Sequence, residues 1–188
     1  LEKVAQIRFP VELTPVTKQY FRATGPMISG AMGAAMSAVA RDENDQEALE
    51  TLSRDPSYNA MLRTTCVATQ LEAGHAPNAL PQRARATLSC RVMQGTSPET
   101  VQQALAQAIG DPRVTVAIER RRDGSPAPPL VDEVMAPVRS AAAKLWPGVP
   151  IVPSMTAGAT DGRFLMVAGV PTYGMSGMFA KPGEANAH

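Results

Sequence analysis

The residues best suited to chemistry gather near the C-terminal end, in the segment 153–179. Small residues at 157–160 let the backbone approach a ligand closely, and Thr160 or Asp161 is suited to cap a following helix. Arg163 then falls in the first turn of that helix, where a cation opposes the helix dipole. Two interpretations stay open. Arg163 binds an anion such as a substrate carboxylate, or it is a surface residue paired with Asp161.

Histidine and cysteine are scarce, with two of each. His75 lies in an expected loop, whereas His188 follows an expected strand on the side where α/β folds bind ligands, so His188 is a candidate ligand. Cys66 and Cys90 lie symmetrically about residue 78 on two expected strands, which allows a cross-strand disulfide. The pattern favours the alternative of two buried free thiols, and no spacing predicts a structural zinc site.

Composition and motifs exclude several classes of protein. The 188 residues contain 18 basic and 17 acidic side chains, for a net charge of +1, and aromatic residues make up 4%. This balance disfavours a nucleic-acid partner, and no apolar run reaches the roughly 18 residues of a membrane span. No nucleophile elbow, nucleotide-binding glycine motif, HExxH or paired-carboxylate motif is complete, so we expect no self-contained active site in this chain.

The elements of the first two thirds predict most of a sandwich. Residues 1–61 are predicted to be helical, and two strands are predicted at 64–71 and 84–92 around a proline-containing loop. A helix follows at 98–109, between a serine cap and a glycine stop, and then a third strand at 114–118. This order, preceded by helical sequence, is most of a β-α-β-β-α-β sandwich whose first strand would lie upstream of the chain.

The last third predicts a second unit. The proline-rich run 123–129 marks the boundary, and a helix follows at 131–145 that is kinked or restarted at a proline. Short strands are predicted at 149–153 and 170–173, with a short helix at 161–167 between them. The alternation indicates part of an α/β domain, and we expect the chain to be a piece of a longer protein whose compartment is not predicted.

Two stretches resemble one family. ATQLEAGHAPNALPQRARATLSCRVMQGTSPETV resembles the dimerisation, or lid, domain of the co-catalytic zinc peptidases, which include glutamate carboxypeptidase, succinyl-diaminopimelate desuccinylase, carnosinase and the aminoacylases. WPGVPIVPSMTAGATDGRFLMVAGVPTYGMSGMF followed by AH resembles the end of their catalytic domain. The resemblance implies an α+β chain with two parts. They are a ferredoxin-like lid sandwich lacking its first strand, with a helical insertion, over 1–124, and the C-terminal part of an α/β catalytic domain over 125–188.

The resemblance also implies a metal-dependent amide hydrolase, in which two zinc ions and a glutamate activate the water that attacks the scissile carbonyl. His188 matches a metal-ligand histidine, and Arg163 matches the arginine that holds the substrate's carboxylate. Gly177 would lie near that carboxylate as a backbone donor. Asn78 matches a lid asparagine that reaches the substrate, in several members across the dimer.

Several parts of that machinery are expected outside this chain. The remaining metal ligands, the glutamate base and the lid histidine belong before Leu1, and His75 does not match that histidine. The chain by itself is therefore predicted to be inactive. The implied substrate is a peptide or N-acyl amino acid, and the implied partner is a second copy bound through the lid. The alternative is a non-catalytic β/α module used for self-association.

Overall fold

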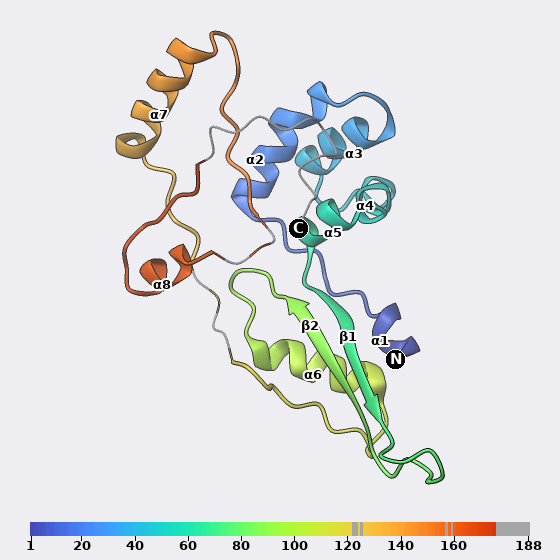
Figure 1. Ribbon diagram of the computed structural model, residues 1–188. Coiled ribbons are helices and arrows are strands. Elements are labelled where there is room, and N and C mark those ends of the chain that lie inside the picture. The colour runs from blue at the N-terminus through green and yellow to red at the C-terminus, as the bar shows by residue number, and fades with distance from the viewer. Residues whose placement is uncertain (122–123, 125, 157, 159, 176–188) are drawn as a thin grey trace.

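The computed structural model describes residues 1–121, 124, 126–156, 158 and 160–175. Figure 1 shows a group of helices, a long β-hairpin with a helix packed beside it, and two further helices that follow in the chain. The helical group consists of α2 (Pro15–Thr24), the short 3-10 turn η1 (Gly25–Met27), α3 (Gly30–Arg41), α4 (Gln46–Ser53) and α5 (Pro56–Leu62).

Polar caps start three of these helices. The side chains of Thr14, Asp45 and Asp55 each accept a hydrogen bond from a backbone N–H in the first turn of α2, α4 and α5. The predicted cap at Thr14 is thereby confirmed. The apolar faces of the helices meet in one core, formed by Phe21, Ala35, Met36, Val39, Ala48, Leu49, Leu52 and Leu62.

Close packing between η1 and α3 depends on a glycine. A Cβ atom built on Gly33 would lie 1.8 Å from the carbonyl oxygen of Ile28 and 2.6 Å from that of Gly25. Both contacts are with backbone, so no side-chain rotation could relieve them. The small residues of this segment are therefore explained by helix packing.

The second group contains the sheet. It consists of α1 (Glu2–Gln6), β1 (Thr65–Ala73), β2 (Ala84–Arg91) and α6 (Pro98–Ile109). The two strands are antiparallel, with an irregularity in register between Ala68 and Gln70. The predicted boundaries of α6 are confirmed: the side chain of Ser97 caps its first turn, and Gly110 ends it in the left-handed region at φ 59°.

One face of the hairpin is covered by α1 and α6. A second core joins Val4 and Phe9 to Val101 and Leu105 of α6, and the partly buried Cys66, Leu88 and Cys90 of the strands pack against it. Successive strand residues point to opposite faces. Val67 therefore points away from this core and is 61% exposed.

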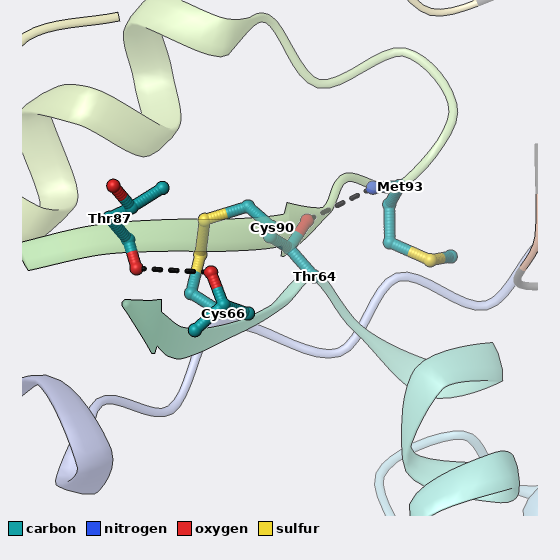
Figure 2. The surroundings of a disulfide bond; sticks show 6 residues. Thr64, Cys66, Thr87, Cys90 and Met93 are labelled. Carbon is teal, nitrogen blue, oxygen red and sulfur yellow. Dashed lines mark hydrogen bonds between the residues drawn. A yellow bond between two sulfur atoms is a disulfide. The ribbon is translucent and has the colours of Figure 1, made fainter. Parts of the chain in front are cut away.

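The cysteines correct the sequence interpretation. Cys66 lies directly opposite Cys90 in the register, their Cα atoms are 4.1 Å apart, and their sulfur atoms form a disulfide (Figure 2). The preference for free thiols was wrong because the pairing brings both side chains to the same face at one position of the ladder. Near the bond, the buried backbone N–H of Met93 donates to Thr64 Oγ1 (3.0 Å) and joins the two strand ends.

Two helices follow the sheet group, α7 (Asp132–Leu145) and α8 (Gly162–Val167). The predicted helix over 131–145 is confirmed, and it continues through Pro137 rather than restarting there. Arg139 Nη2 donates to Asp132 Oδ1 (2.7 Å) near the start of α7. No helix of the described residues is both long and apolar enough to cross a membrane.

Three predicted strands, at 114–118, 149–153 and 170–173, are not formed within the described residues. A strand needs the backbone of a neighbour to satisfy its N–H and C=O groups, and the described sheet contains only β1 and β2. The segment at 114–118 instead accepts a bond from Gln102 Nε2 at the oxygen of Val116 (2.7 Å). Mixed helix and strand content agrees with the α+β class, while the sandwich stays a prediction.

Candidate functional site

Asn78 lies in the loop between β1 and β2. The loop leaves β1 at Gly74, whose φ of 75° favours glycine, and the N–H of Ala79 donates to the oxygen of Ala76 (3.3 Å) in a tight turn. Asn78 is exposed within this turn. Its amide therefore belongs to the loop of a hairpin whose two strands the disulfide joins.

Arg163 lies in the first turn of α8, as predicted, but the cap differs from the prediction. Asp161 is the N-cap residue in helical conformation, and its side chain makes no capping hydrogen bond. The guanidinium of Arg163 stacks on the neighbouring ring, with Cζ 4.3 Å from the centroid of Phe164. Within the described part of the chain Arg163 forms no ion pair with Asp161, so the interpretation as a paired surface arginine is not supported.

The turn before Arg163 is held against the segment that follows α8. A Cβ built on Gly162 would lie 2.9 Å from Thr172 Cγ2 and 3.2 Å from Thr160 Oγ1. Both atoms belong to side chains, so a side chain at position 162 would require Thr172 to shift. The hydroxyl of Tyr173 donates to the carbonyl oxygen of Pro129 and ties the same segment to the chain before α7.

Among the described residues, the structure does not bring Asn78 and Arg163 together within one chain. Figure 1 shows the loop that carries Asn78 at the far end of the hairpin from α8, which carries Arg163. Gly177 and His188 lie outside the described residues. The expectation that His188 shares a face with Arg163 therefore stays a prediction.

The described residues do not fit a zinc site. They contain no group of three or more His, Cys, Asp or Glu side chains that could hold a metal ion. Both cysteines are consumed by the disulfide, so neither can supply a thiolate. A complete metal centre would need ligands from outside the part that the structure describes.

A cleft of about 1100 Å³ was not foreseen from the sequence. It lies between the chain leading into α2 and helix α4 with the segment before it, and its lining includes Arg8, Arg54 and Arg63. No motif joins these three arginines, because they come from separate segments that only the packing of the helical group brings together. No spacing in the sequence could have indicated this cleft.

Comparison with known families supports a class for this architecture. Residues 23–115, which include both strands and α6, match the family model described as a peptidase dimerisation domain. The class is therefore an α+β dimerisation domain of a peptidase. The match covers just under half of the chain and supports its assignment to the M20 peptidase family. No solved structure matches it significantly.

Curated relatives carry names from the same family. The chain is 36% identical over 77 residues to a probable carboxypeptidase S-like 1 of Dictyostelium discoideum, covering 41% of this chain and 16% of that protein. It is 30% identical over 115 residues to the N-fatty-acyl-amino acid synthase/hydrolase PM20D1 of Mus musculus, covering 60% of this chain and 23% of that protein. The chain thus spans less than a quarter of the length of either relative.

Proposed function

We propose that the intact protein is a zinc-dependent exopeptidase or amidohydrolase that cleaves an amide bond in a substrate with a free carboxylate. The observation that carries the proposal is the match to the peptidase dimerisation domain. The names of the relatives, a carboxypeptidase and an N-fatty-acyl-amino acid hydrolase, support an amide bond next to a carboxylate. The substrate class is a peptide or an N-acyl amino acid.

Arg163 is the residue that binds the carboxylate of the substrate. Its guanidinium is half-buried and stacked on Phe164, which restricts its rotation and leaves its edge available for paired N–H bonds to a carboxylate. Gly177 adds a backbone N–H near that carboxylate. His188 is one ligand of a two-zinc centre whose other ligands lie elsewhere in the protein. When bound, the metal lowers the pKa of a water molecule for attack on the amide.

Asn78 acts on the substrate held by a second subunit. Its loop and α8 lie apart within one chain. Asn78 and Arg163 would therefore contribute to the same site only if they came from two copies of the chain in a dimer. In this proposal residues 1–124 form the lid through which two copies associate, and residues 125–188 are the C-terminal part of the catalytic domain. The substrate would thus be held between Arg163 of one copy and Asn78 of the other.

Hydrolysis assays of the intact protein test the proposal. N-acyl amino acids and dipeptides with a free carboxylate should be hydrolysed, and the same compounds with a C-terminal amide should be poor substrates. Dialysis against a chelator should abolish the activity, and added zinc should restore it. Hydrolysis that persists after complete metal removal, or that is equal for carboxylate and amide, would contradict the proposal.

A self-association module without catalysis is the second candidate. Within the described residues β1 and β2 pair only with each other, so each strand offers an unpaired edge to a second copy. Sedimentation of the intact protein measures the dimer in either case. A stable dimer that hydrolyses none of the substrates, with zinc supplied, would favour this candidate over the enzyme.

A further inference from the structure

Three arginines line the cleft of about 1100 Å³ beside the helical group. Arg8 belongs to the extended chain between α1 and α2, Arg54 follows α4, and Arg63 follows α5. Arg8 and Arg54 are exposed and Arg63 is half-buried. The side chains therefore converge from three segments on one solvent-accessible space.

The charge of the lining is positive. The cleft also contains Glu43 and Glu50, but Glu43 is committed to an ion pair with Lys18. Within the described residues no ion pair joins Arg8, Arg54 or Arg63 to a carboxylate. An excess of cationic groups in a recess attracts anions, because its walls concentrate the field.

Arg63 is held in place by hydrogen bonds that use only part of its donor set. Its Nη2 donates to Ser53 Oγ (3.1 Å) and its Nη1 to the carbonyl oxygen of Phe9 (3.4 Å). The hydroxyl of Ser53 in turn donates to the oxygen of Leu49 (2.6 Å), so its lone pairs face the guanidinium. A guanidinium carries five N–H donors, and its buried Nε–H has no partner in the described structure.

The environment of Arg63 also disfavours its charge. Burial lowers the pKa of its guanidinium, and the neighbouring Arg8 cation lowers it further. Two cations lie close together here, and among the described residues neither forms an ion pair with a carboxylate, so a bound anion would relieve their repulsion. The unused N–H donor of Arg63 and its repulsion by Arg8 thus both favour a bound anion.

We propose that this cleft binds a small organic anion, a carboxylate or a phosphate, between Arg8, Arg54 and Arg63. Guanidinium groups match the paired oxygens of both anions, and two exposed arginines next to one hydrogen-bonded arginine can contact an anion from several sides. Val11 and Leu13, which also line the cleft, supply an apolar wall for the carbon skeleton of the ligand. The site takes its residues from the helical group and the chain before it, and it does not use Arg163.

Titration calorimetry on the intact protein tests this site, with inorganic phosphate and succinate as probes at an ionic strength held constant with chloride. At least one probe should bind, and the preferred probe identifies the ligand as phosphate or carboxylate. Arg8→Gln and Arg54→Gln should each raise Kd about tenfold, as expected for a lost charge-assisted bond. Arg22→Gln is the matched control, since Arg22 is exposed on α2 and does not line the cleft.

The variants distinguish this site from the proposed substrate site. Arg163→Gln should leave the binding of the probe to the cleft unchanged, while Arg8→Gln and Arg54→Gln weaken it. Binding of neither probe at millimolar concentration would overturn the inference. The inference would also be overturned if Arg163→Gln abolished binding while Arg8→Gln and Arg54→Gln left it unchanged. That result would not contradict the proposed hydrolase function.

Discussion

Cys66 on β1 and Cys90 on β2 occupy directly opposed positions of the hairpin and are joined by a disulfide. The bond links the strand that leaves the helical group to the strand that leads into α6 (Figure 1). It also closes the chain segment that contains the loop with Asn78. The position of that loop therefore depends on a covalent link as well as on the strand ladder.

Removal of the disulfide should destabilise the protein. The bond encloses a segment with a sequence separation of 24, and closing a loop of this size stabilises by about 3 kcal/mol through the unfolded chain. The double variant Cys66→Ser/Cys90→Ser should lower Tm by roughly 6–12 °C in thermal unfolding monitored by circular dichroism. Ser89→Ala, at an exposed neighbouring position of β2, should change Tm little.

Reductant provides the complementary measurement. Reducing agent should lower the Tm of the unsubstituted protein towards that of the double variant and leave the double variant itself unaffected. In unreduced, denatured protein the two cysteines should resist alkylation. Alkylation of both without reductant would contradict the pairing.

Loss of the Arg163 guanidinium should weaken catalysis on substrates with a free carboxylate. Arg163→Ala in the intact protein should lower kcat/KM, with a loss of about 2–4 kcal/mol in transition-state stabilisation, because a charge-assisted pair of N–H bonds is lost. Arg163→Lys keeps the charge but not the planar fork and should recover only part of this loss. Substrates with a C-terminal amide should show little difference between the variants. An unchanged kcat/KM on carboxylate substrates would rule out this role.

Mixed dimers test whether Asn78 acts across the interface. Asn78→Ala and Arg163→Ala should each have low activity alone. In a mixed dimer one site combines the intact Arg163 of one subunit with the intact Asn78 of the other. Random reassociation of equal amounts should then restore about a quarter of the unsubstituted activity, since half the dimers are mixed and each has one intact site. Activity no higher than that of the two variants measured separately would place both residues in the same subunit's site.

Gly33 should tolerate no side chain. Gly33→Ala introduces a Cβ that would lie 1.8 Å from the backbone oxygen of Ile28, and α3 must move away from the turn before it. Overpacking of this kind costs about 3 kcal/mol, visible as a lower Tm or as loss of soluble protein. Ala34→Ser is the matched control, because Ala34 is exposed on the same helix. Equal stability of the two variants would refute this packing.

The local elements could be predicted because their signals are local. The cap at Thr14, the serine and glycine that bound α6, and the helix that contains Arg163 all follow from residues within one or two turns. The two strands of the hairpin were predicted for the same reason, from alternation on either side of a loop with glycine and proline. The exposed loop position of Asn78 followed directly from that hairpin.

Long-range partners were harder to predict. The segments at 149–153 and 170–173 have strand-like composition, yet they do not form strands among the described residues because composition does not supply a neighbouring backbone. The free-thiol interpretation failed for a related reason. Symmetry about residue 78 placed Cys66 and Cys90 opposite each other, but whether two thiols join depends on how closely the strands approach.

The sequence by itself determined the helices, the hairpin, the class of the chain and its resemblance to a peptidase lid, because capping, periodicity and motif order act over short distances. Only the tertiary structure decided that the cysteines are bonded and that three arginines share a cleft. These depend on which segments pack together. Burial and charge are properties of that packing, and no single stretch of sequence contains them.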